Sequence, residues 1–286
     1  MENNTKKIKS IISSHKEEIM PGIHINVPFP STDLRHVSPY VLLHHFGPFE
    51  VNKQNTFSFD PHPHRGFEAV TFLFEGEFEH KDSTGGYGRL SGGDVQWMTA
   101  GSGVIHVEKQ PDEFIEKGGI VHGIQLWVNL PKEHKMTGPH YKDIKNNTIP
   151  VIEDNYIKLR VIAGNYKNKA GPANTYTPML VIHGAAKAGT ETTLEIPSGF
   201  NSLIYVTKGI LNISGSKTAA GQMALMESDG SSVNIKSIDN SEFMLLAGEP
   251  INEPVVQYGP FVMNSMAEVK QAFLDYSEGL MGSISN

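Results

Sequence analysis

Two pairs of residues with metal-ligating side chains stand out in this sequence. His62 and His64 are separated by one residue, and so are His106 and Glu108. In an extended strand successive side chains point to opposite faces, so each pair would present both of its side chains on one face. Pro63, between the two histidines, favours extended backbone at the start or edge of a strand. Each of the two strands would therefore offer two ligands.

Three imidazoles and one carboxylate form a mixed set of nitrogen and oxygen ligands. Such a set suits iron, manganese, nickel or copper, and zinc also accepts these ligands. Four protein ligands leave coordination positions free, which indicates a reactive metal. The alternative is a buried polar network in which the same side chains hydrogen-bond to one another.

The composition excludes several classes of protein. The net charge of −7 argues against a protein that binds nucleic acid through its phosphates, because such proteins usually carry a basic face. Cysteine is absent, so the sequence contains no disulfide, no thiolate zinc site and no cysteine nucleophile. The N-terminus lacks the apolar core of a signal peptide, and no run of apolar residues is long enough to span a membrane. We expect a cytoplasmic protein, or also a nuclear one if the source is eukaryotic.

The residues after His64 follow a strong β pattern. If the strand continues without a bulge, Val70, Phe72 and Phe74 share the parity of His64 and would wall an apolar pocket beside the metal. The alternative for these three side chains is the core of a barrel. Glu68 has the same parity and would also face the site.

A short apolar strand at residues 40–43 ends in two adjacent histidines. His44 and His45 are candidates for additional ligands. Adjacent residues face opposite ways in a strand, so at most one of the two can join the site.

A second run of strands begins at Val151 and looks like a copy of the first. Placing Gly76 on Gly209 aligns residues 68–76 with 201–209, and no histidine occupies the positions that match the candidate ligands. His62 and His64 then match Glu195 and Pro197, and placing Gly93 on Gly221 matches His106 and Glu108 with Asn234 and Lys236. The sequence therefore predicts an internal duplication in which only the first copy binds a metal.

The length of 286 residues is long for one core and comfortable for two domains. We predict a metal-binding barrel at residues 1–133, a linker at 134–150 and a metal-free barrel at 151–286. The second barrel would end in a helix over Met266 to Tyr276, because Asn264 or Ser265 can cap it and Gly279 stops it.

Several blocks of the chain together resemble the pirin family of the cupin superfamily. These are His-Pro-His-Arg-Gly-Phe-Glu at 62–68, Gly-Asp-Val-Gln-Trp-Met-Thr-Ala-Gly at 93–101, Ile-His-Val-Glu at 105–108, Gln-Leu-Trp-Val-Asn-Leu at 125–130 and the run from Leu246 to Asn264. The resemblance implies an all-β fold with two cupin-type (jelly-roll) β-barrel domains packed face to face. It also implies an N-terminal barrel that binds iron through three histidines and a glutamate.

The position of the carboxylate ligand differs between the general cupin pattern and the pirin pattern. The general cupin pattern places it four residues after the second histidine, at Glu68, whereas the pirin pattern places it two residues after the last histidine, at Glu108. We follow the pirin pattern and take His62, His64, His106 and Glu108 as the metal ligands. Glu68 would then accept a hydrogen bond from a ligand histidine or from Arg65, although Arg65 is more often a structural ion-pair partner.

The resemblance implies a metal-dependent dioxygenase, with iron as its metal, that cleaves flavonols such as quercetin with O2. Glu108 would serve as general base, and Gln125 would either hydrogen-bond near the metal or face solvent. The alternative is a redox-sensitive regulatory protein that carries a metal and binds a transcription factor or another protein. A third hypothesis is a small-molecule binder with a structural metal.

Overall fold

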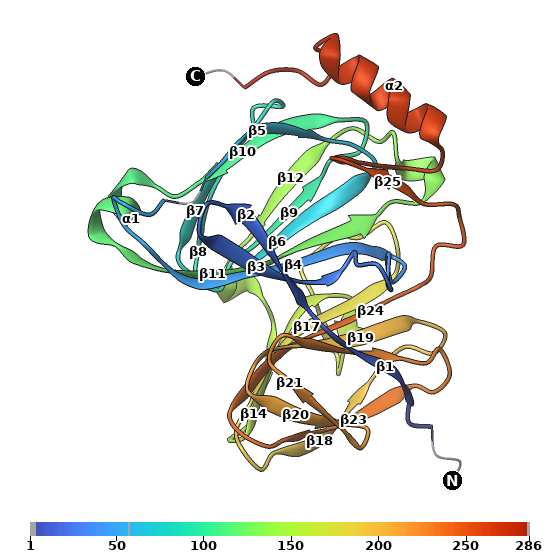
Figure 1. The fold of residues 1–286 in the computed structure, drawn as a ribbon. Coiled ribbons are helices and arrows are strands. Elements are labelled where there is room, and N and C mark those ends of the chain that lie inside the picture. The colour runs from blue at the N-terminus through green and yellow to red at the C-terminus, as the bar shows by residue number, and fades with distance from the viewer. Residues whose placement is uncertain (1–3, 57, 285–286) are drawn as a thin grey trace. The chain divides into compact units, whose positions relative to one another are not determined.

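The structure is a computed structural model that describes residues 4–56 and 58–284, and it is almost entirely β (Figure 1). It confirms the predicted fold class of two cupin-type barrels with a short C-terminal helix. One compact unit is formed by the chain up to Pro39 together with Asn147–Pro250, and the other by Tyr40–Asn146 together with the chain from Ile251 onward. Each unit thus combines two distant segments, whereas the sequence analysis divided the chain into continuous ones.

The unit that contains the candidate ligands has two sheets. In the larger sheet β12, β9, β6, β11 and β4 are neighbours in that order, and the smaller sheet has the order β5-β10-β7-β8. The C-terminal segment adds a hairpin and the helix α2. The bounds are β4 Tyr40–Val51, β5 Ser58–His64, β6 Phe67–Glu75, β7 Glu77–Asp82, β8 Tyr87–Ser91, β9 Val95–Thr99, β10 Val104–Lys109, α1 Asp112–Lys117, β11 Gly119–Asn129, η1 Lys132–His134, β12 His140–Ile144, β25 Val256–Tyr258, β26 Phe261–Met263 and α2 Met266–Ser277.

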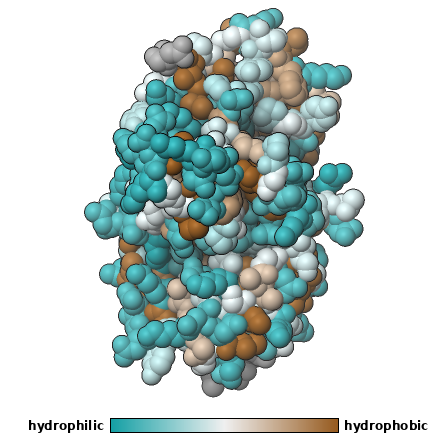
Figure 2. Space-filling model, turned by 60° about the vertical axis from the view of Figure 1, so that its left-hand side comes forward, coloured by the Kyte–Doolittle hydropathy of each residue, from teal (hydrophilic) through white to brown (hydrophobic). Residues whose placement is uncertain are grey.

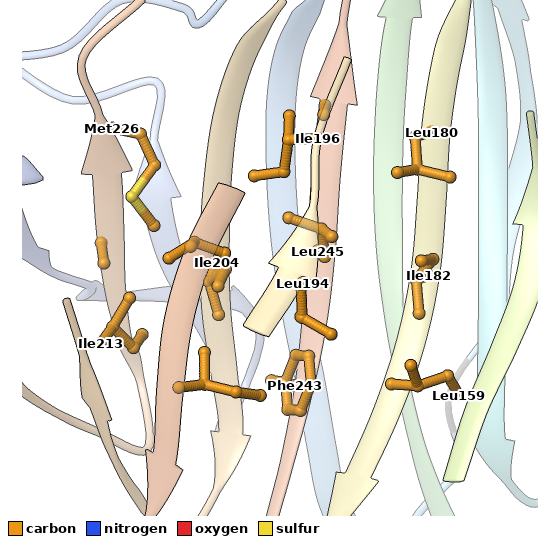
Figure 3. Close-up of a cluster of buried hydrophobic side chains, with 14 of the residues drawn as sticks. Leu159, Leu180, Ile182, Leu194, Ile196, Ile204, Ile213, Met226, Phe243 and Leu245 are labelled. Atoms are coloured by element: carbon orange, nitrogen blue, oxygen red, sulfur yellow. The ribbon is translucent and has the colours of Figure 1, made fainter. Parts of the chain in front are cut away.

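The other unit has a large sheet in which β1, β22, β19, β24, β17, β14 and β13 follow one another, and a smaller sheet of order β18-β23-β20-β21. Apolar side chains from both sheets, among them Leu180, Ile204 and Leu194, meet in a buried core (Figure 3). The bounds are β1 Ile8–Ser13, β2 His15–Met20, β3 Ile23–Phe29, η2 Asn146–Thr148, β13 Val151–Glu153, β14 Ile157–Ala163, β15 Asn165–Tyr166, β16 Lys169–Ala170, β17 Met179–Ala186, β18 Glu191–Glu195, β19 Asn201–Lys208, β20 Ile210–Ile213, β21 Ser216–Ala219, β22 Gln222–Met226, β23 Ser232–Ser237 and β24 Ser241–Gly248.

The strand orders of the two units match and confirm the predicted internal duplication. The order β9-β6-β11-β4 corresponds to β22-β19-β24-β17, and β5-β10-β7-β8 corresponds to β18-β23-β20-β21. Glu195 ends β18, and Asn234 and Lys236 lie in β23, on the two strands that match β5 and β10. The second copy therefore keeps the scaffold without the histidines.

Two local predictions had different outcomes. Ser265 caps α2, because its Oγ accepts from the backbone N of Glu268 at 3.2 Å, and the helix ends one residue beyond the predicted end. Residues 134–150 were predicted to be loop-like, but they contain β12, which pairs with β9. Because β12 is an edge strand with alternating exposure, its polar side chains concealed it in the sequence.

The surface is consistent with the polar composition. The face shown in Figure 2 is largely hydrophilic, with hydrophobic residues in small scattered groups. Within the described residues, the helices are all too short or too polar to cross a membrane.

Candidate metal centre

The predicted histidine ligands meet on two paired strands. β5 and β10 are antiparallel, and their register places His62 opposite His106. The Nε2 atoms of these two rings are 2.9 Å apart, and the ring centre of His64 lies 4.8 Å from that of His62 and 4.9 Å from that of His106. One candidate ligand atom from each ring lies within 4.8 Å of the others. The three imidazoles thus surround a common point.

Backbone carbonyls orient two of the three rings. His62 Nδ1 lies 2.8 Å from the carbonyl oxygen of Asp60, and His64 Nδ1 lies 3.4 Å from that of Pro260. Because a carbonyl oxygen only accepts, each Nδ1 carries the proton, and the Nε2 lone pair is available for a metal.

The electrostatics of the site also favour ligation. Burial lowers the pKa of His64 and His106 well below the ordinary value, and the neighbouring imidazoles lower it further. The rings are therefore neutral, which is the form that binds a metal. His106 Nδ1 is buried and has no hydrogen-bond partner among the residues that the structure describes.

Glu108 follows His106 on β10 after an irregularity in the pairing with β5. Its Oε1 accepts a hydrogen bond from Gln96 Nε2 at 3.2 Å and lies 3.4 Å from Thr71 Oγ1. Glu108 also belongs to a second potential cluster with His80 and His106, whose ligand atoms lie within 4.8 Å of one another.

His80 is nevertheless not suited to be a ligand. Its Nε2 lies 3.0 Å from Asp82 Oδ2, and its Nδ1 lies 3.0 Å from Gln96 Nε2. His80 is also fully buried and is absent from the lining of the cavity onto which the other histidines open. The donor set that remains is the predicted one, and its three imidazoles and one carboxylate fit a divalent transition metal.

A cavity of about 400 Å³ opens onto these residues. Two aromatic side chains, Phe59 and Trp127, form part of its wall, and the C-terminal hairpin contributes its turn. Trp127 stacks on Phe67 with ring centres 4.2 Å apart, which holds it in place. The lining residues are His44, Phe59, Asp60, His62, His64, His106, Glu108, Gln125, Trp127, Gly259 and Pro260.

The apolar wall expected at Val70, Phe72 and Phe74 is not part of this lining. The expectation required one uninterrupted strand, but β5 ends at His64 and β6 begins in the other sheet after a corner at Gly66. Gly66 has φ +86°, and this turn resets the alternation of side chains. As a result Thr71, and not its neighbours, reaches Glu108.

Arg65 and Glu68 are not among the residues that line the cavity. Glu68 accepts from Thr99 Oγ1 at 2.8 Å, so the expected bond to a ligand histidine or to Arg65 is not found within the described ranges. Arg65 donates to the carbonyl of Ser102 at 2.7 Å and to Asp275 Oδ2 at 2.6 Å. Its interactions are those of a structural ion-pair partner.

His44 and His45 lie in the middle of β4, which continues beyond the predicted end at residue 43, and they separate as their parity requires. His44 lines the cavity, whereas His45 Nε2 lies 2.8 Å from His122 Nε2 in a buried pair. Gln125 also lines the cavity, and its Oε1 accepts from Thr71 Oγ1 at 3.0 Å. Of the two expected positions, near the metal site or facing solvent, Gln125 takes the one near the site.

Other residues of the site were missed by the sequence analysis. Trp127 shares the parity of Gln125 on β11, and His80 and Asp82 form another pair with one residue between them, so the same parity rule would have found them. Gly259 and Pro260 carry no such signal, because only the folded chain brings them to His64.

The fold and the site together define a cupin-type protein in which one of two barrels carries a site of three histidines and a carboxylate. The family model Pirin matches residues 22–128, and the model described as Pirin C-terminal cupin domain matches residues 181–282. The chain belongs to the pirin family.

Individual relatives cover almost the whole chain. It is 38% identical over 281 residues to Pirin-1 of Arabidopsis thaliana, covering 96% of this chain and 94% of that protein. It is 34% identical to Pirin of Homo sapiens, covering 98% and 95%. The crystal structure of quercetin 2,3-dioxygenase from Acinetobacter baumannii matches with a TM-score of 0.92 and 37% identity, covering 98% of this chain and 100% of that one.

Proposed function

We propose that this protein is a metal-dependent dioxygenase, with iron as its metal, that cleaves flavonols such as quercetin with O2. The observation that carries the proposal is the convergence of His62, His64, His106 and Glu108 on one cavity with aromatic side chains in its wall. The similarity to the Acinetobacter baumannii protein, whose name states this activity, supports the choice of substrate.

The three histidines and Glu108 would hold the metal, which when bound supplies a Lewis acid and a redox centre for O2. The cavity has room for a small aromatic molecule, and Phe59 and Trp127 provide flat apolar surfaces for its rings. Ordering the substrate between these walls and the metal site reduces the entropic part of the barrier.

Glu108 would take a proton from a substrate hydroxyl. Its Oε1 is held by Gln96 and lies beside Thr71, so Oε2 is the oxygen that would bind the metal and, once the substrate oxygen takes that position, would receive the proton. Removing this proton leaves an electron-rich enolate-like oxygen on the substrate, which is the form that reacts with O2.

The test is O2 uptake with quercetin by the iron-loaded protein, beside the metal-free protein and a Glu108→Gln variant shown to contain iron. We expect iron-dependent uptake and a rate about 10²-fold or more lower in the variant, since general bases contribute about 10² to 10⁴. Glu191→Gln is the matched control, because Glu191 is an exposed carboxylate on β18 of the other unit.

No uptake by a protein with stoichiometric iron would overturn the dioxygenase proposal. An unchanged rate in Glu108→Gln would leave the reaction in place but remove Glu108 as its base.

A further inference from the structure

A row of buried polar side chains lies behind Glu108, outside the cavity lining. It consists of Gln96 on β9 with His80 and Asp82 on β7, which are 1%, 0% and 6% exposed. Gln96 Nε2 contacts Glu108 Oε1 at 3.2 Å and His80 Nδ1 at 3.0 Å, and His80 Nε2 contacts Asp82 Oδ2 at 3.0 Å. The row therefore connects Glu108 to the end of β7.

The two carboxylates at the ends of this row determine which of its groups donate and which accept. The amide NH2 group of Gln96 donates twice, to Glu108 and to Nδ1 of His80. His80 must then carry its proton on Nε2 and donate it to Asp82. Rotating the Gln96 amide by half a turn would place its oxygen against the carboxylate of Glu108, which is repulsive.

Two backbone amides and one hydroxyl anchor the far end of the row. Asp82 Oδ1 accepts from Thr84 N at 2.8 Å, Thr84 Oγ1 at 2.6 Å and Gly86 N at 3.0 Å. Burial alone would raise the pKa of Asp82, but the hydrogen bonds from His80, Thr84 and Gly86 outweigh it and hold the pKa below the ordinary range. Asp82 is thus a fixed acceptor.

We propose that Asp82, His80 and Gln96 are positioning residues that orient the carboxylate of Glu108 for the metal and the substrate. The row holds Oε1, and within the described residues Oε2 has no hydrogen-bond donor. Oε2 is therefore the atom presented to the metal. This inference rests on the proposed role of Glu108 in the metal site.

The metal alone tests the proposal, without quercetin. Co²⁺ is the probe, because its visible absorption spectrum changes when a ligand of the metal changes. The dissociation constant is measured by competition with a chelating dye, and thermal unfolding of each metal-free variant checks its fold. Loss of dioxygenase activity would leave this readout untouched, so failure of the two proposals can be told apart.

The first variant removes the donor. We expect Gln96→Leu to weaken Co²⁺ binding about 10- to 100-fold and to alter the spectrum, as for other groups that orient a ligand. In a Glu108→Ala background the same substitution should change the affinity less than about 2-fold, because Gln96 acts through Glu108. An equal loss in both backgrounds would overturn the proposal.

The second variant reverses the tautomer of His80 without removing a polar group. In Asp82→Asn the three donors keep an oxygen at the Oδ1 position, so the new NH2 faces His80 and forces the opposite tautomer. The Gln96 amide must then turn its oxygen toward Glu108, and we expect the Co²⁺ affinity to fall as in Gln96→Leu.

Thr84→Ala is the matched control for this reversal. It removes one donor to Asp82 but keeps the tautomer of His80. Its Co²⁺ affinity should therefore stay within about 2-fold of the wild type. Wild-type Co²⁺ affinity and spectrum in Asp82→Asn would show that the tautomer of His80 and the orientation of the Gln96 amide do not matter, and would overturn the proposal.

Discussion

His106 Nε2 lies 2.9 Å from His62 Nε2, across two strands that pair these residues directly. The backbone carbonyl of Asp60 holds the proton of His62 on Nδ1, so His62 Nε2 is an acceptor. A hydrogen bond at this distance requires the proton on Nε2 of His106. A neutral imidazole that binds a metal through Nε2 keeps its one proton on Nδ1, so we expect metal binding to shift the His106 proton from Nε2 to Nδ1.

Metal binding should depend on His106 more than on any exposed histidine. His106→Ala removes the ring shared by both candidate clusters, and we expect metal affinity to fall more than about 100-fold. Metal analysis of the purified variant measures this, with His15→Ala on β2 as the control. The unit built around the core of Figure 3 should remain folded. Stoichiometric metal in His106→Ala would contradict the ligand assignment.

The ion pair between Arg65 and Asp275 should stabilise the C-terminal helix. Asp275→Asn leaves the nearly buried guanidinium of Arg65 without its charged partner, so we expect a lower melting temperature. Replacing both residues by Met should recover much of the loss, because no charge is then left unpaired. The exposed pair of Lys236 and Glu191 is the control, and Glu191→Gln should scarcely change the melting temperature.

The stability of the protein should depend on pH through Glu68. Burial raises the pKa of Glu68 to about 7, against an ordinary value of 4.5, although the hydrogen bond from Thr99 opposes the shift. Between these values the folded state binds more protons than the unfolded state, so stability falls as pH rises from about 4.5 to about 7.

Glu68→Gln keeps an acceptor for Thr99 and cannot ionise. Relative to wild type it should gain about 1–3 kcal/mol between pH 4.5 and pH 8. Urea unfolding midpoints at the two pH values measure the difference. The same pH dependence in both proteins would mean that Glu68 is not the group responsible.

The corner between β5 and β6 should tolerate no side chain. A Cβ at Gly66 would lie 2.1 Å from the carbonyl oxygen of Val262, and its φ of +86° is unfavourable for alanine. We expect Gly66→Ala to destabilise the protein by more than about 2 kcal/mol and to weaken metal binding, because His64 lies two residues away.

Gly199 is the matched position in the other unit. Its φ is +81°, and a Cβ there would meet nothing within 4 Å. Gly199→Ala should therefore destabilise the protein only through its unfavourable φ, by about 1 kcal/mol. Equal destabilisation in the two variants, seen in thermal unfolding, would show that the contact with Val262 does not matter.

The sequence carried enough information for the fold class, the duplication and the grouping of the three histidines. Strand parity holds over short distances, so His62 and His64, or Gln125 and Trp127, share a face. Parity failed across Gly66, because a left-handed residue redirects the chain and no side-chain pattern records it.

Other features depend on contacts between distant segments. The division into units was not visible in the sequence, because each unit joins segments that are far apart along the chain. The partners of Glu68 and Arg65 likewise depended on which strands become neighbours, and each side chain had several candidates of suitable chemistry.

The wall formed by Gly259 and Pro260 has a consequence for biosynthesis. The carbonyl of Pro260 that orients His64 lies 196 residues after it in the chain. During synthesis on the ribosome the three histidines emerge long before this wall exists, so the nascent chain carries an incomplete site. The complete site can therefore form only after residue 260 has been synthesised and the C-terminal segment has packed beside His64.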